Sequence, residues 1–275
     1  MNVSHLAKGS LLLLALTALN ANAHRAWILP NQTTVSGDEA VVSFDAAVSN
    51  EIFTADHSAL RTNAFLVTAP DGSSANAKDV HSGKTRTSFD LILSEEGTYR
   101  VSVASAGLMA RWETEDGKRG FWPERGKPAK DSEFDKAVPK NAKNLQVSYN
   151  ARRMETFVTN GTPSTGALAL TNQGLELVPV THPNDLFAGE VARFRFVMDG
   201  KPAAGVDVAL VREGTRYRNS QEEIELKTDA NGEVAIQWNG AGRYFLEASY
   251  KDDKAKAPAT SRSASYTAVL EVMPD

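Results

Sequence analysis

After residue 23 the chain has no long apolar pattern with the 3.6-residue period of a helix, and this constrains the fold more than any other feature. The apolar residues fall instead into short runs bounded by glycine, aspartate and asparagine. In the run at 191–197, phenylalanines alternate with arginines, as in a strand with one buried face. Further strands are predicted at 63–69, 145–159, 206–211 and 233–238. The pattern predicts an all-β protein built from immunoglobulin-like β-sandwiches.

The order of these signals repeats along the chain. In each half, a glycine followed by an acidic residue precedes an apolar run, and a Gly-x-Tyr strand follows later. The members of this repeat are Gly37-Asp38 with 40–44, then 97–103, and Gly189-Glu190 with 191–197, then 242–248. We therefore interpret residues 24–174 as an N-terminal sandwich and residues 175–275 as a C-terminal immunoglobulin-like sandwich.

The segment at 106–145 interrupts this pattern because it is rich in lysine, glutamate, glycine and proline. We interpret it as a long polar excursion from the first sandwich, and its part at 117–128 as too broken to form a strand. Trp112 and Trp122 lie in this excursion. Exposed indoles there would stack on a sugar, whereas buried ones would cover the edge of a core.

Residues 1–23 have the three parts of a signal peptide. Lys8 precedes an apolar stretch at 11–19, and Ala21-Asn22-Ala23 forms an A-x-A cleavage site. The apolar stretch is shorter than the roughly 20 residues that span a bilayer. The alternative is a short anchor that stays attached. We expect a periplasmic protein cleaved after Ala23, with no membrane insertion after cleavage.

Charge and cysteine content exclude several classes of function. The formal net charge is −4, so the chain lacks the basic surface that nucleic-acid binding requires. It contains no cysteine, which excludes disulfides, thiolate metal sites and cysteine nucleophiles. A tight transition-metal site must therefore use imidazole, carboxylate or the α-amine.

Cleavage after Ala23 would make His24 the first residue, which offers its α-amine and its ring Nδ1 to one cation. The other histidines of the mature chain are His57, His81 and His182, and Asp56 precedes His57. We consider these four side chains as further candidate ligands, although no pair has metal-ligand spacing. The alternative for His57, His81 and His182 is a solvated or capping loop histidine.

Catalytic motifs are absent from the sequence. It contains no G-x-S-x-G, P-loop or H-E-x-x-H pattern, and neighbouring carboxylates such as Glu95-Glu96 would point to opposite faces of a strand. The Arg152-Arg153 pair is interpreted as a solvated strand edge. We expect a binding protein without enzymatic activity. The least favoured alternative is a copper redox enzyme that uses an N-terminal histidine brace.

Several segments carry a resemblance to a known family. They are 24–30 (HRAWILP), 155–158 (ETFV), 174–179 (GLELVP), 200–202 (GKP), 228–232 (TDANG) and 241–244 (AGRY). With them the chain resembles a family of periplasmic proteins described as nickel/cobalt transport system components. The resemblance implies a part in the uptake of nickel, cobalt or copper beside an outer-membrane receptor or an inner-membrane transporter. It also implies that His24 meets the metal. The alternative function is a glycan- or protein-binding envelope module without a metal.

Overall fold

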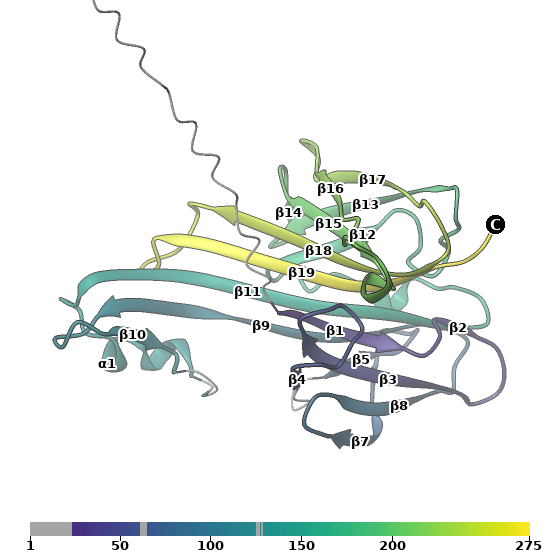
Figure 1. Cartoon of the computed structure of the whole chain (residues 1–275), viewed down its shortest axis with the longest axis horizontal. Helices are drawn as coiled ribbons and strands as arrows, with labels where there is room; N and C mark the ends of the chain where they lie inside the picture. The colour runs from purple at the N-terminus through teal and green to yellow at the C-terminus, as the bar shows by residue number, and fades with distance from the viewer. Residues whose placement is uncertain (1–23, 61–64, 125–126, 128) are drawn as a thin grey trace, which may run out of the picture.

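The computed structural model describes residues 24–60, 65–124, 127 and 129–275 (Figure 1). The predicted signal peptide lies outside the described residues, and so do the first two residues of the strand expected at 63–69. In the described part, no helix is long and apolar enough to cross a membrane. The protein is an all-β sandwich structure, as the sequence predicts.

The strands of the described residues form three sheets. Sheet A consists of β1 (Arg25–Pro30), β3 (Ala40–Ser49), β8 (Thr87–Leu93) and β7 (Lys78–Ser82), with β4 (Ser58–Ala59) beside β3. Sheet C consists of β12 (Leu175–Pro179), β13 (Val191–Met198) and β14 (Lys201–Pro202), with β17 (Glu233–Gln237) beside β13.

Sheet B is the largest sheet and contains strands from both halves of the chain. Its order is β16 (Ile224–Lys227), β15 (Asp207–Arg212), β18 (Gly242–Asp252), β19 (Ser261–Val272), β11 (Lys143–Asn160), β9 (Gly97–Glu113), β5 (Leu66–Thr68) and β6 (Ser74–Ala75). Two further strands pair at its sides, β10 (Arg119–Trp122) with β9 and β2 (Thr34–Val35) with β11. In Figure 1 the long strands of this sheet run side by side across the molecule.

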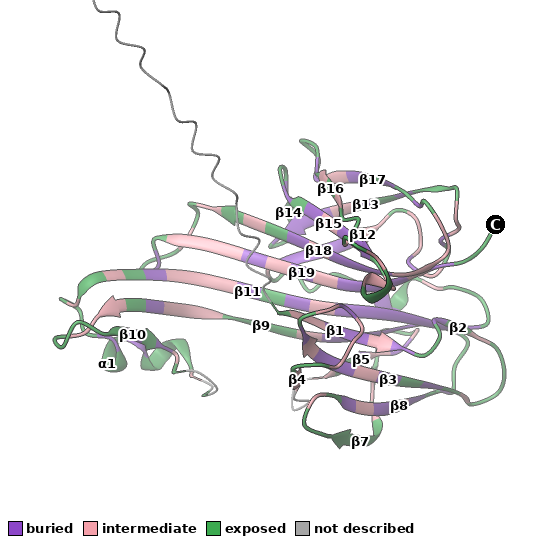
Figure 2. Ribbon diagram, in the orientation of Figure 1, coloured by how far each residue is buried: buried purple, intermediate pink, exposed green. Residues whose placement is uncertain are grey.

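Sheets A and C pack on opposite faces of sheet B. Adjacent residues of a strand point to opposite faces. On β11, Val158 joins the core formed with sheet A, whereas Phe157 joins the core formed with sheet C. Figure 2 shows the resulting band of buried residues along the part of β11 that both sheets cover. The molecule is therefore a pair of sandwiches that share their middle sheet.

The join between the two sandwiches is a parallel strand pair. β11 lies in the first predicted sandwich, and it pairs antiparallel with β9 along one edge and parallel with β19 along the other. The domain boundary at 174/175 stays a prediction, but backbone hydrogen bonds of sheet B cross between the two units. Sequence periodicity reports which face of a strand is buried, not which strand lies at its edge, so this pairing was not predicted.

The two Gly-x-Tyr segments adopt the same local structure, which supports the predicted repeat. Gly97 and Gly242 have φ values of +128° and +133°, which favour glycine. Two residues later, the hydroxyls of Tyr99 and Tyr244 donate to backbone carbonyls four positions upstream, at Glu95 (3.3 Å) and Gly240 (2.8 Å). This back-bond is the tyrosine corner of immunoglobulin-like sandwiches.

The segment at 106–145 forms an arm that packs around a small core, which Val147 and Ala259 also join. β9 continues to Glu113, and β10 occupies part of the stretch at 117–128, so the prediction of no strand there is wrong. Gly120 faces Trp112 across the strand pair, and a Cβ at this position would lie 2.2 Å from the indole. Hydrophobic packing between distant segments thus overrides the local turn signals.

Short helical turns complete this arm and the loops. They are η1 (Asp131–Glu133), α1 (Phe134–Ala137), η2 (Gly166–Leu168) and η3 (Thr215–Tyr217). In the arm, Trp122 is 7% exposed and meets Phe134 edge-on, with ring centroids 5.2 Å apart. Trp122 therefore covers a core and is not a free platform for sugar stacking, which removes the main support for a glycan-binding function.

Candidate functional site

The start of the first described strand is held firmly against both halves of the molecule. Arg25 pairs in register with Ser49 of β3. Trp27 is 2% exposed, its indole Nε1 donates to the Ser49 hydroxyl at 2.8 Å, and its ring packs against Phe245 and Val269 of sheet B. The backbone next to His24 is therefore fixed by a buried anchor.

Arg25 adds a polar anchor to the C-terminal half. Its guanidinium donates to the Gln221 side chain at 2.7 Å and to the Glu223 carboxylate at 2.6 Å, and it lies 3.7 Å from Glu247. It also lies over the Phe245 ring, 5.6 Å from the centroid. The Arg25 guanidinium bonds to two side chains and lies on an aromatic ring, and so it keeps the adjoining His24 in place.

His24 and His57 are brought together by the fold. Their rings stack with centroids 3.9 Å apart and an angle of 14° between the planes, and both residues are exposed. His57 belongs to the loop between β3 and β4, which is closed by a 2.9 Å hydrogen bond from the Asn50 amide to the Asp56 carboxylate. Ile52 anchors this loop in the same small core as Trp27.

The two stacked imidazoles offer two ligands for a metal ion, but in this arrangement they do not form a coordination shell. Stacked rings direct their nitrogen lone pairs past each other, so joint binding of an ion requires rotation about the χ angles of His24 or His57. Two exposed side chains permit that rotation. Asp56 is exposed beside His57, but among the described residues no three side chains of histidine, aspartate or glutamate gather in metal-binding geometry.

His81 is not brought to this pair. It lies on β7, the edge strand of sheet A, in register with Ser88. Ser88 pairs with Asp45, which pairs with Leu29, so His81 aligns with the far part of β1 and is three strands away from it. With about 4.8 Å between strands, His81 is too far to share an ion with His24.

His182 is a structural residue. It is half-buried, and its Nδ1 accepts the Asn184 amide at 3.1 Å, while Nε2 lies 3.1 Å from both the Ser164 carbonyl and the Thr98 hydroxyl. Both ring nitrogens are therefore occupied by hydrogen bonds. Burial lowers the pKa of His182 below its ordinary value, despite the opposing effects of the Ser164 carbonyl and Asp185.

The lowered pKa of His182 predicts a loss of stability in acid. The unfolded chain, with a histidine pKa of about 6.5, binds this proton more readily than the folded chain. The neutral His182 ring therefore stabilises the fold fully above about pH 6.5. This stabilisation is lost as the pH falls below that value toward the folded-state pKa. We expect the melting temperature to fall less between neutral pH and about pH 5 in His182→Gln than in the wild type. Parallel curves would contradict this assignment.

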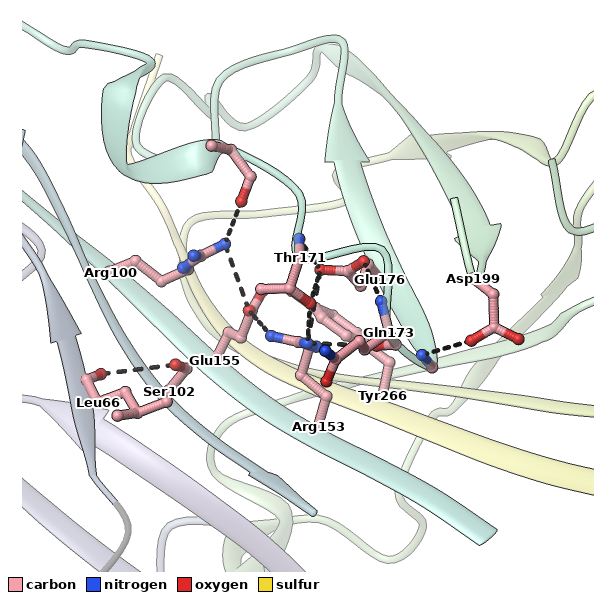
Figure 3. Close-up of polar contacts among 12 residues, drawn as sticks. Leu66, Arg100, Ser102, Arg153, Glu155, Thr171, Gln173, Glu176, Asp199 and Tyr266 are labelled. Carbon is pink, nitrogen blue, oxygen red and sulfur yellow. Dashed lines mark hydrogen bonds and ion pairs between the residues drawn. The ribbon is translucent and has the colours of Figure 1, made fainter. Parts of the chain in front are cut away.

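A buried ionic network between sheets B and C is the largest feature that sequence reasoning missed. Arg153 donates to Glu155 at 3.2 Å and to the Thr171 hydroxyl at 2.7 Å, and it lies 3.5 Å from Glu176 (Figure 3). Arg100 approaches Glu155 at 3.7 Å, and Tyr266 donates to Glu155 at 2.9 Å.

The interpretation of Arg152-Arg153 as a solvated strand edge is wrong, because β11 pairs with both β9 and β19 at these residues. Arg152 is exposed on the open face of the sheet, whereas Arg153 is 7% exposed. Burial together with the neighbouring Glu155 charge raises the pKa of Tyr266 well above its ordinary value, so the phenol stays protonated and donates. The signal in the sequence was the Arg-x-Glu spacing, which places opposite charges on one strand face.

Comparisons with known proteins give a family and remote structural likenesses. The D0-D1 domain of intimin matches at 12% identity, with 90% of this chain and 97% of that chain covered and a TM-score of 0.22. A two-domain fibronectin type III segment from chicken tenascin matches at 8% identity, with 91% and 100% covered and a TM-score of 0.21. A DUF3823 family protein from Bacteroides uniformis matches at 12% identity, with 80% and 93% covered and a TM-score of 0.23.

Likenesses at these TM-scores carry no argument about function. No curated protein matches the chain. Residues 21–252 match the family described as a domain of unknown function, DUF4198. This match spans most of the chain, including His24, Arg25, His57 and most of sheet B, and the protein therefore belongs to the DUF4198 family.

Proposed function

We propose that the protein is exported to the periplasm, loses residues 1–23, and binds a divalent nickel, cobalt or copper ion through the new N-terminal His24 together with His57. The observation that carries this proposal is the contact of the two imidazoles, 3.9 Å between centroids, at the predicted cleavage site. The A-x-A motif before His24, the absence of cysteine and the resemblance of 24–30 to metal-transport components support it.

The donor set suits these ions. Cleavage frees the α-amine of His24, which together with Nδ1 of the same residue chelates one cation, and a ring nitrogen of His57 adds a third ligand. Three neutral nitrogens favour nickel, copper and cobalt over magnesium or calcium, which prefer oxygen. Because these ligands bind only when deprotonated, binding of the metal releases protons.

The surroundings of the histidines reduce the cost of binding. Trp27 and Arg25 fix the backbone next to His24, and Ile52 fixes the loop that carries His57. A chain end that is already ordered loses less conformational entropy when the ion arrives. The pair is exposed, which is the property needed if the ion passes on to an outer-membrane receptor or an inner-membrane transporter.

The test compares two single histidine variants. Protein purified from the periplasm, with His24 verified as its first residue by intact mass, is titrated calorimetrically with Ni²⁺, Co²⁺ and Cu²⁺. We expect His57→Ala to weaken binding by more than about tenfold, because loss of a direct ligand costs at least as much as loss of its supporting contacts. The matched control is His81→Ala, which removes an exposed histidine of the same sheet and is expected to bind as the wild type does.

Two results would redirect the proposal. Equal affinities for the wild type, His57→Ala and His81→Ala would remove the histidine pair as the site. After rotation of one side chain, the pair would also supply the second histidine that a histidine brace for copper requires. Reductant-dependent consumption of oxygen by the Cu²⁺-loaded protein, lost in His57→Ala, would therefore favour the copper redox enzyme over a transport component.

A further inference from the structure

A polar groove runs across the part of sheet B that sheet A leaves open. The groove has a volume of about 430 Å³, and it is lined by the far parts of β9, β11, β18 and β19. Its lining includes the polar and charged residues Arg111, Asn150, Arg152, Ser249, Lys251, Ser263 and Ser265. This groove lies on the same face of β11 as Met154, which packs against the sheet A core.

The strand register arranges these side chains in two rows. Ser249 pairs with Ser265, which pairs with Arg152, and this gives one row across three strands. In the next row, Lys251 pairs with Ser263, which pairs with Asn150. Each row therefore presents hydroxyl or amide groups with a cation at one end. At about 4.8 Å per strand spacing, Arg152 starts roughly 10 Å from Ser249.

The groove carries an excess of positive charge. Arg111, Arg152 and Lys251 are exposed, and within the described ranges none of the three has a carboxylate at ion-pair distance. The acidic residue that lines the groove is Asp207, which is paired with Lys227 at 2.7 Å. Free cations among hydroxyl and amide groups are complementary to an anion that carries several oxygen atoms.

The groove leads toward Arg25, the residue next to His24. Ser249 and Asp207 also line an adjoining groove of about 350 Å³, whose wall includes Arg25, the neighbour of His24. That wall carries four carboxylates. Glu223 and Glu247 are engaged by the Arg25 guanidinium and Asp207 by Lys227, which reduces their repulsion of an incoming anion, and Glu225 is the fourth. A ligand in the open part of sheet B would thus have a polar path to the mature N-terminus.

The proposed donor set leaves room for a ligand that the protein does not supply. Three nitrogens leave at least one position of a square-planar or tetragonal Ni²⁺ or Cu²⁺ ion open, and carboxylate oxygen is a suitable ligand for it. We infer that the cargo is a metal chelate of a small polycarboxylate. One carboxylate would ligate the ion at His24 and His57, and the others would pair with Arg152 and Lys251. This inference rests on the proposed function and names its substrate.

The test uses equilibrium dialysis with two labels, radioactive nickel and carbon-labelled citrate, on the mature protein. We expect nickel and citrate to be retained together in equal amounts, and citrate alone to be retained poorly. In the variant Arg152→Gln/Lys251→Gln, retention of citrate in the presence of nickel should fall by about tenfold, because the variant removes both cations that pair with the carboxylates of citrate, and exposed pairs are individually weak. Retention of nickel without citrate should not change.

The matched control is Lys78→Gln/Lys201→Gln, which removes the same charge from exposed positions on β7 and β14. Equal citrate retention by both double variants, or citrate that strips nickel from the protein, would overturn the chelate inference while nickel binding alone still upheld the proposed function. Absence of nickel retention without citrate in the wild type would overturn the proposed function and, with it, this inference.

Discussion

One additional glycine in front of His24 is expected to abolish tight Co²⁺ binding, with a loss of affinity of more than about 100-fold. The extra residue converts the α-amine of His24 into an amide, which does not ligate a divalent ion at neutral pH without losing its proton. The new amine lies one residue away and closes a chelate ring with the His24 imidazole only through the deprotonated amide, which forms readily with Cu²⁺ but not with Co²⁺ at neutral pH. The two rings themselves stay, so the change isolates the contribution of the terminus.

The measurement is a calorimetric titration of the two proteins with Co²⁺, after their first residues have been verified by intact mass. Their melting temperatures serve as the control, because Trp27 and Arg25 hold the strand in place whatever precedes residue 24. Unchanged tight binding by the glycine-extended protein would place the metal elsewhere. Weak and equal binding by both would leave the protein without a metal function.

Replacement of Arg153 by methionine is expected to lower the free energy of unfolding by about 3–5 kcal/mol, the usual cost of removing one partner from a buried ion pair. Glu155 and Glu176 are 3% and 2% exposed. Glu155 would retain only Arg100, at 3.7 Å, and the Tyr266 hydroxyl. The carbon chain of methionine fills most of the volume, so the loss reports the charge and not a cavity.

The neighbouring residue provides a matched control. Arg152→Met changes the same side chain on the same strand, but Arg152 points to the open face and is exposed, so its unfolding free energy should stay within about 0.5 kcal/mol of the wild type. Urea denaturation followed by tryptophan fluorescence measures both variants. Similar midpoints for Arg153→Met and Arg152→Met would show that the network contributes little to stability.

The sequence predicts the strands better than their arrangement. Alternating phenylalanine and arginine at 191–197 identify β13 because one face of that strand is buried and the other is not. β11 is buried on both faces over residues 155–160, so its pattern does not alternate there, and charged side chains such as Glu155 sit inside. The pairing of β11 with β19 depends on backbone hydrogen bonds, which leave no mark on residue type.

The sequence predicts only part of the candidate site, because it does not show which distant segments meet. His24 was predicted because the A-x-A cleavage motif that precedes it is visible in the sequence. Its meeting with His57 depends on the loop after β3, which Ile52 and Asp56 close, and no spacing rule connects two residues in such different segments. Arg25 was not recognised as an anchor because its partners, Gln221 and Glu223, lie almost two hundred residues away.

The parallel pairing of β11 with β19 also bears on how the chain reaches its native state. β19 follows the other strands of the described residues, so residues 148–156 of β11 have no native partner on that edge until residues 261–269 are available. Contacts of such high contact order form late, and an unpaired strand edge is a template for association with other chains. Folding of the first sandwich is therefore tied to completion of the second, and a chain shortened before Ser261 would be prone to aggregate rather than to form a smaller stable domain.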